Sequence, residues 1–401
     1  MTDLRNETML ILGDLIGFPT VTSDSNRDLI AYAESKLAAV GATVSITRHP
    51  EEDKANLLAT IGPAVDGGVV LSGHTDVVPA DEDAWTGAPF VAMRRDQRIY
   101  GRGAVDMKGF IACVLAMAPT FASADLRRPI HVALTFDEEV GCRGAPILVS
   151  DLLRMGPVPA AAIVGEPTEM AIIDAHKGCY EYTTTITGLA GHGSAPSLGV
   201  NAVQVASRYV SRLLELGRML EHRAPVGSPY DPPHTTINVG VVSGGTARNV
   251  VAGECVIEWE MRPVTRSDSE FVLAGVEAVE EELGEEMRRV SDDVSIVTRT
   301  EGAVDGLESD PASAAVALGR ALLGDQPTAV VSFGTEAGIY QAAGIPAIVC
   351  GPGSIDMAHR PDEYIEISEL ERCLEMLAVL TTHLSAVPRA GSDVEVRSNP
   401  G

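Results

Sequence analysis

The sequence predicts an α/β fold that is interrupted by a smaller α+β unit, and three observations support this prediction. Short apolar strand patterns alternate with helical patterns over residues 1–179. From residue 180 the strand patterns alternate between apolar and polar side chains, in the order strand, helix, strand, strand, helix. From residue 294 the first pattern resumes. Strands that alternate with helices indicate a sheet covered on both faces, whereas period-two strands indicate a sheet with one solvated face.

The first part of the chain begins with helical spacing of apolar residues. The second of its helices follows a Ser/Asp/Asn cluster that suits a helix N-terminus, and it ends at Gly41. Runs rich in β-branched residues then predict buried strands. The expected helices span residues 7–17, 26–40 and 109–121, and the expected strands span 42–47, 56–61, 68–73, 131–136, 160–165 and 171–174.

The inserted part starts with an alternating strand over residues 180–188 and continues with a long helix over 201–221. Two further alternating strands (235–242 and 254–261) precede a charged helix (269–289). After it we expect strands over 329–332 and 347–351 and a helix over 369–384. The predicted division is a larger domain in two parts (1–179 and 292–386), an inserted domain (180–291) and a polar tail (387–401).

Composition restricts the possible partners. The chain has 401 residues with 56 acidic and 30 basic side chains, a net charge of −26. Such a field repels phosphate and anionic lipid, so nucleic acid and membrane surfaces are not expected partners. The six cysteines show no paired spacing, and the first residues lack the basic and apolar regions of a signal peptide. We therefore expect a protein of the reducing cytoplasm.

Histidine and carboxylate side chains, which can bind metal ions or transfer protons, follow predicted strands or loops at five places. These places contain His74 with Asp76, Asp106 in the segment 101–109, the acidic run 137–139, Glu166, and His359. Each alone has a structural explanation, such as a turn or a solvated charge. The segment 101–109 also begins like a dinucleotide fingerprint, but Asp106 stands where the third glycine belongs, which excludes that interpretation. The five together favour a bound cation.

Two imidazoles and three carboxylates, without a thiolate, suit a pair of Zn²⁺ or similar ions. Two ions roughly 3.5–4 Å apart need a shared ligand, which a carboxylate can provide, and a water held between them loses its proton near neutral pH. Successive side chains of an extended segment point apart. Glu138 and Glu139 are therefore expected to differ in role, one as a ligand and one handling protons.

These segments resemble the metal-site segments of the dinuclear zinc aminoacylase/carboxypeptidase family, in order and across nearly the whole chain. The resemblance rests on His74-Thr75-Asp76, Gly101-Arg102-Gly103, Asp106-Met107-Lys108-Gly109, Asp137-Glu138-Glu139, Gly165-Glu166-Pro167-Thr168 and Met357-Ala358-His359. It implies a zinc-peptidase-like α/β catalytic domain, with a mixed sheet flanked by helices, interrupted by an α+β, ferredoxin-like domain that serves as lid and dimerisation domain.

The resemblance also implies two divalent metal ions, most consistently Zn²⁺ with Co²⁺ as an alternative. One would be held by His74, Asp106 and Glu166, and the other by Asp106, Glu139 and His359. Asp106 would bridge them, with a cis peptide bond just after it. Asp76 would orient His74, and Glu138 would act as the general base.

In the inserted domain the resemblance implies that His192 reaches a neighbouring active site in a homodimer and stabilises the developing oxyanion. It also implies that Asn249 and Arg262 grip the α-carboxylate of a substrate, although Arg262 before a proline could equally be structural.

The implied reaction is hydrolysis of the N-acyl amide of a small-molecule amino acid. Similarity of the segments 333–337, 350–356 and 359–364 to family signatures implies N-acetyl-L-ornithine as substrate, giving L-ornithine and acetate for arginine biosynthesis. Desuccinylation of succinyl-diaminopimelate, or another aminoacylase or carboxypeptidase activity, is the alternative. Glu336 would repel a second carboxylate and favour an ammonium group, unless it is a structural acid. An alternative from another functional class is a non-catalytic metal-binding dimer, in which Glu138 would have no role.

Overall fold

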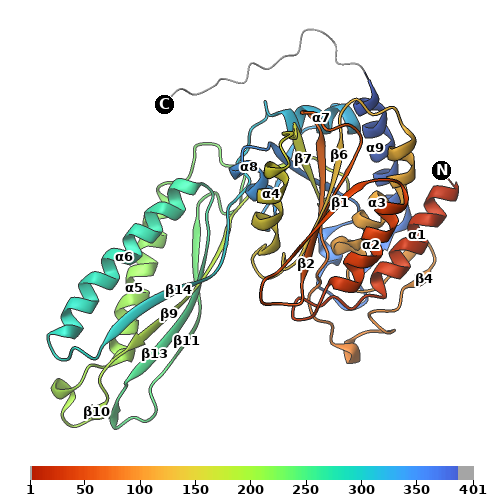
Figure 1. Cartoon of the computed structure of the whole chain (residues 1–401). Coiled ribbons are helices and arrows are strands. Elements are labelled where there is room, and N and C mark those ends of the chain that lie inside the picture. Colours follow the sequence, from red (N-terminus) through yellow and green to blue (C-terminus); the bar gives the residue numbers. More distant parts are fainter. Residues whose placement is uncertain (1, 387–401) are drawn as a thin grey trace.

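The computed structural model describes residues 2–386, and its centre is a mixed sheet (Figure 1). The polar tail expected at 387–401 lies outside the described residues. The sheet contains, in spatial order, β1 (Thr43–Arg48), β2 (Ala55–Ile61), β6 (Ile130–Thr135), β3 (Val69–His74), β7 (Ala161–Pro167), β16 (Ala347–Gly351), β8 (Ile173–His176) and β15 (Ala329–Val331). Its four central strands β6, β3, β7 and β16 are parallel neighbours, while β1, β2 and β8 add antiparallel pairs.

Helices cover both faces of this sheet, which explains why its strands read as continuous apolar runs. On one face lie α1 (Thr2–Ile16), α2 (Arg27–Ala39), α3 (Gly109–Ser123), α7 (Ala314–Leu323) and α9 (Ile367–Ser385), and on the other lie α4 (Gly144–Arg154) and α8 (Ala337–Ala342). Val69 and Leu71 pack into the core under the first group of helices, whereas Val70 between them packs into the core under α4 and α8. The segment Ala104–Ser123 is apolar enough to cross a membrane, but 89% of its most apolar window is buried, which identifies it as a core helix.

The inserted part forms a separate antiparallel sheet (Figure 1). Its spatial order is β11 (Thr236–Gly244), β13 (Glu254–Arg262), β9 (Cys179–Thr187) and β14 (Ser295–Val304). Helices α5 (Ala202–Glu221) and α6 (Arg266–Arg288) pack on one face of it, against alternate residues such as Tyr182, Ile186 and Ile257. The chain order of strands and helices is that of a ferredoxin-like unit.

The inserted domain extends beyond residue 291, where the sequence predicted its end. The segment β14 pairs in antiparallel register with β9, so the smaller sheet continues to Val304. The reason is that β9 has an unpaired edge, and a strand that returns from α6 fills it before the chain re-enters the larger part.

A third, three-stranded sheet was not predicted from the sequence. It consists of β17 (Tyr364–Glu366), β5 (Arg98–Tyr100) and β4 (Met93–Arg95). Strand β5 leads directly into the segment that holds Asp106, and the His359 loop leads directly into β17. This small sheet therefore brings together two segments that are distant in sequence.

Candidate metal centre

The five predicted segments meet at one edge of the large sheet. His74 is the last residue of β3, Glu138 and Glu139 follow β6, and Glu166 lies near the end of β7. Because β6, β3 and β7 are parallel neighbours, their carboxyl ends lie side by side. Asp106 comes from the segment that precedes α3 and His359 from the loop after β16, and both complete the same cluster.

Asp106 stands between the two imidazoles. Its Oδ1 lies 2.9 Å from His74 Nε2, and its Oδ2 lies 3.2 Å from His359 Nε2. Glu139 lies 3.1 Å from His359 Nε2, and Glu166 Oε1 lies 3.6 Å from His74 Nε2. The peptide bond from Asp106 to Met107 is cis, as the family resemblance implies. All five predicted ligands are thus close together, with one carboxylate facing both histidines.

Bound cations explain the arrangement of this cluster better than interactions among its own side chains do. Ligand atoms of His74, Asp106 and Glu139 lie within 4.8 Å of one another, and so do those of His74, Glu138 and Glu166. Glu166 Oε1 is buried without a hydrogen-bond partner. Several carboxylates at this distance repel one another, and burial of each one opposes ionisation. Nitrogen and oxygen ligands in this arrangement match a pair of zinc-like ions.

The pKa values of the individual side chains reflect the burial and the close approach of these carboxylates. Burial and the charge of Asp106 raise the pKa of Glu166 well above its usual value, and burial likewise raises the pKa of Glu138. Burial also opposes ionisation of Asp106, but the two histidines outweigh it and hold its pKa far below the usual range. Hydrogen bonds to Asp106 and Glu139 raise the pKa of His359 to about 10. Cations would replace the protons that these groups otherwise share.

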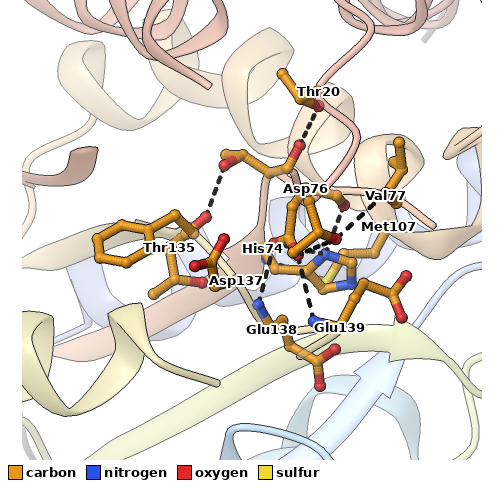
Figure 2. Close-up of polar contacts among 12 residues, drawn as sticks. Thr20, His74, Asp76, Val77, Met107, Thr135, Asp137, Glu138 and Glu139 are labelled. Atoms are coloured by element: carbon orange, nitrogen blue, oxygen red, sulfur yellow. Dashed lines mark hydrogen bonds and ion pairs between the residues drawn. The ribbon is translucent and has the colours of Figure 1, made fainter. Parts of the chain in front are cut away.

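Asp76 holds the loop that carries the acidic run (Figure 2). Its carboxylate accepts hydrogen bonds from the backbone N–H groups of Glu138 at 3.1 Å and Glu139 at 3.3 Å. His74 Nδ1 donates to the backbone carbonyl of Asp76 at 2.9 Å, whereas the Asp76 carboxylate is 3.7 Å away. Burial opposes ionisation of Asp76, yet His74 and the two N–H groups lower its pKa. Asp76 therefore binds His74 through its backbone carbonyl, and its carboxylate fixes the next ligand segment, which the sequence did not predict. That Asp76 orients His74 for metal binding stays a prediction.

The carboxylates of Glu138 and Glu139 point in different directions (Figure 2). Glu139 faces His359, whereas Glu138 Oε1 accepts a long contact of 3.6 Å from the Cys142 thiol. The side chain of His359 is 52% exposed, so the centre is open to solvent on that side. A substrate can approach there.

Two predicted residues lie far from the centre. His192 is on β10 (Gly191–His192), which pairs with β12 (Val250–Val251), and Gly193 N donates to Asn249 O at 2.7 Å. Figure 1 shows β10 at the end of the smaller sheet that is remote from the large sheet. Within one chain, His192 and Asn249 lie together and away from the carboxylate cluster.

Arg262 ends β13 at the opposite end of the smaller sheet. Eight steps of about 3.3 Å separate the two ends of this strand, roughly 26 Å. Arg262 Nη2 donates to Glu260 at 2.7 Å. Asn249 and Arg262 therefore do not meet within a single chain, and a shared grip on one carboxylate would need a second copy.

Glu336 lies in the body of the protein rather than in an open pocket. Its side chain is buried, and Ser72 Oγ donates to Oε2 at 3.0 Å. Burial raises the pKa of Glu336. Its role in ammonium selectivity stays a prediction.

Two further charged pairs adjoin the centre and were missed in the sequence. Lys54 pairs with Asp137 at 2.6 Å, and Arg102 pairs with Glu363 at 2.7 Å. Arg102 and Glu363 stand inside segments that resemble the family, which was the only available signal. Nothing in the sequence marks Lys54.

Comparison with known proteins agrees with this geometry. A family model described as peptidase family M20/M25/M40 matches residues 70–383. A protein of Myxococcus xanthus named acetylornithine deacetylase is 36% identical over 390 residues, covering 96% of this chain and 99% of that protein. A protein of the same name from Yersinia pseudotuberculosis is 34% identical, covering 92% and 95%.

Solved structures share the fold. An M20 family metallo-carboxypeptidase from Sulfolobus solfataricus has a TM-score of 0.75 at 16% identity, covering 95% of this chain and 100% of that one. A tripeptidase from Staphylococcus aureus has a TM-score of 0.74 at 22% identity, covering 95% and 98%. The zinc-peptidase-like fold expected from the sequence is confirmed. The family match and the identity of the relatives along nearly the whole chain establish that this chain belongs to peptidase family M20/M25/M40.

Proposed function

We propose that this protein hydrolyses the acetyl amide of N-acetyl-L-ornithine, releasing L-ornithine and acetate. The observation that carries the proposal is the buried cluster of histidines and carboxylates with Glu138 beside it, in a chain whose relatives at 34–36% identity are named acetylornithine deacetylase. No observation favours desuccinylation of a dicarboxylate or a non-catalytic metal-binding role.

The ligand assignment is the one that the family resemblance implies, and the distances among these side chains support it. His74, Asp106 and Glu166 would hold one divalent ion, and Asp106, Glu139 and His359 the other. Nitrogen and oxygen ligands suit Zn²⁺, and they accept Co²⁺ as well. When bound, the ions supply Lewis acidity to the amide carbonyl and to the attacking water.

Glu138 handles the protons. Its carboxylate lies at the cluster without being needed to complete either ligand set, and it takes the proton of the attacking water. It then delivers that proton to the amine nitrogen as the C–N bond breaks, so that ornithine leaves neutral at that atom. Asp76 keeps Glu138 in place through the backbone bond at 3.1 Å.

A homodimer completes the site in this proposal. His192 and Asn249 are remote from the cluster of their own chain, so a second copy would bring them to it, where His192 donates to the developing oxyanion. Arg262 lies at the end of the smaller sheet that is nearer to the cluster, and it would bind the substrate α-carboxylate. This use of residues 180–291 makes the inserted part a lid and dimerisation domain.

A cytoplasmic role in arginine biosynthesis accompanies this activity. All six cysteines are in the described part of the chain and none of them forms a disulfide, which supports a reducing compartment.

A substrate panel with a matched variant tests the proposal. Protein reconstituted with Zn²⁺ should hydrolyse N-acetylornithine faster than N-acetylmethionine, succinyl-diaminopimelate or a dipeptide. Glu138→Ala should retain two metal ions, measured by elemental analysis, and lose at least about 100-fold in kcat, the range expected for a general base. Unchanged hydrolysis by Glu138→Ala, or a preference for another member of the panel, would contradict the proposal.

A further inference from the structure

The carboxylate of Glu363 is buried against the segment that carries Asp106. Its Oε1 accepts hydrogen bonds from the N–H groups of Val105 at 2.9 Å and Asp106 at 3.3 Å. Its Oε2 accepts from Gly103 N at 3.1 Å and from Arg102 Nη1 at 2.7 Å. Glu363 is 1% exposed. One carboxylate therefore satisfies four donors from five consecutive residues.

The backbone strengthens this connection. Gly101 N donates to Glu363 O at 3.0 Å, and Tyr100 pairs with Tyr364 where β5 meets β17. Glu363 lies four positions after His359, whereas Gly101 lies five positions before Asp106. The segments that present two of the candidate ligands are thus fastened to each other by a main-chain bond and by the Glu363 side chain.

Arg102 extends the contact to a third ligand segment. Its Nη2 donates to Pro79 O at 3.2 Å, and Pro79 lies on the loop after His74. Its Nη1 also reaches Arg360 O at 3.4 Å, next to His359. The guanidinium therefore links the loops of His74, Asp106 and His359 through one buried ion pair.

We propose that Glu363 is a positioning residue for the metal centre, and that its carboxylate sets the backbone of Asp106 relative to His359 so that both can hold the same ion. This inference rests on the proposed function, because it needs the two ions assigned above. A carboxylate that accepts four hydrogen bonds cannot shift without losing several of them together. Outer partners of this kind typically contribute 10- to 100-fold to metal affinity.

The expected effect is uneven between the two ions. The ion held by Asp106, Glu139 and His359 takes ligands from both fastened segments, whereas the ion held by His74, Asp106 and Glu166 takes one ligand from them. Loss of the Glu363 carboxylate should therefore weaken the first of these ions more than the second.

The test is a metal titration of Glu363→Gln, which keeps the side-chain size but places an N–H₂ group against N–H donors. Metal-free protein is titrated with Zn²⁺ against a chromophoric chelator, and Co²⁺ binding is followed by visible absorption. We expect one ion of nearly wild-type affinity and one weakened by about 10- to 100-fold. Glu366→Gln is the matched control, because Glu366 pairs with Arg98 on the surface and should change affinity less than about twofold.

Two further variants separate positioning from charge and from folding. Glu363→Asp keeps the charge but shortens the reach, so positioning predicts that it also weakens one ion, and wild-type affinity in this variant would overturn the proposal. Arg102→Met keeps the backbone donors and should weaken the same ion by a smaller factor, which decides the matter if both Glu363 variants fail to fold. If wild-type protein binds no pair of ions, the proposed function itself fails. If wild-type protein binds two and Glu363→Gln binds them equally well, this inference alone fails.

Discussion

Lys54 and Asp137 form a buried ion pair, and Asp137 directly precedes the proposed base Glu138 and the candidate ligand Glu139. Lys54 Nζ lies 2.6 Å from Asp137 Oδ1 and also donates to Thr22 O at 2.8 Å. The two side chains are only 9% and 2% exposed. Asp137 has a positive φ of 56°, which places it in the left-handed region at the point where the chain turns from β6 towards Glu138. This pair therefore fixes the start of the acidic run.

Breaking this pair from one side should destabilise the protein strongly. Lys54→Met leaves the buried Asp137 charge uncompensated, so we expect the free energy of unfolding to fall by about 3–5 kcal/mol in metal-free protein. The double variant Lys54→Met/Asp137→Asn should lose less than the sum of the single variants. Urea denaturation of all three measures both effects.

A surface pair provides the control for that cycle. Arg27 and Asp53 are 2.7 Å apart but exposed, so their removal should change the free energy of unfolding by no more than about 1 kcal/mol. Additive losses at Lys54 and Asp137 would mean that the pair is not coupled.

At the scale of elements, α3 packs closely on β7 beside the candidate metal centre. Gly165 precedes Glu166 on β7, and an added Cβ at Gly165 would overlap the ring of Phe110 in the first turn of α3. Phe110 is itself fully buried. The strand that carries Glu166 and the helix that follows Asp106 thus touch where only a glycine fits.

Gly165→Ala should consequently lower the free energy of unfolding by about 1–3 kcal/mol through overpacking. Phe110→Leu in the same chain should recover part of that loss. Gly217→Ala is the opposite control, because its Cβ would meet nothing within 4 Å on helix α5, and alanine there should stabilise by about 0.5–1 kcal/mol. Thermal unfolding measures the series, and an unchanged melting temperature in Gly165→Ala would contradict the packing argument.

The sequence predicted those elements whose patterns are local. Val69, Val70 and Leu71 predicted a buried strand because both faces of the sheet are covered. His74, Glu139 and Glu166 were predictable because the parallel strands β3, β6 and β7 place their carboxyl ends at one edge, whereas the placement of Asp106 and His359 beside them came from the family resemblance. The three-residue strands β4, β5 and β17 are too short to show a period. The contact between Arg102 and Glu363 joins residues 261 positions apart, and neither shows a pattern that predicts its partner.

At the scale of the whole molecule, the proposed homodimer, in which His192 acts at the metal centre of the other copy, can be tested by mixing two inactive variants. Glu138→Ala and His192→Ala should each be nearly inactive alone. After dissociation and reassociation, about half of the dimers should be mixed, and each should contain one intact site, which restores about a quarter of wild-type activity. Activity assays before and after mixing measure this.

Failure to recover activity, with mixed dimers demonstrated by differently tagged chains, would mean that His192 does not act in the neighbouring subunit. Mixing Glu138→Ala with itself, tagged in the two ways, controls for the dissociation procedure.

The two crossings between the larger and smaller parts of the molecule are neighbouring strands of one sheet, since β9 leaves the larger part and β14 returns to it in paired register. A hydrogen-bonded ribbon of this kind flexes easily across its plane and resists shear within it. Lys177, just before β9, adds a second connection to the smaller part, because its ammonium group donates to the carbonyls of Pro232 at 2.8 Å and His234 at 2.9 Å. A change in the angle between the two parts would therefore have to bend β9 and β14 together, because the hydrogen bonds between them link the two strands residue by residue.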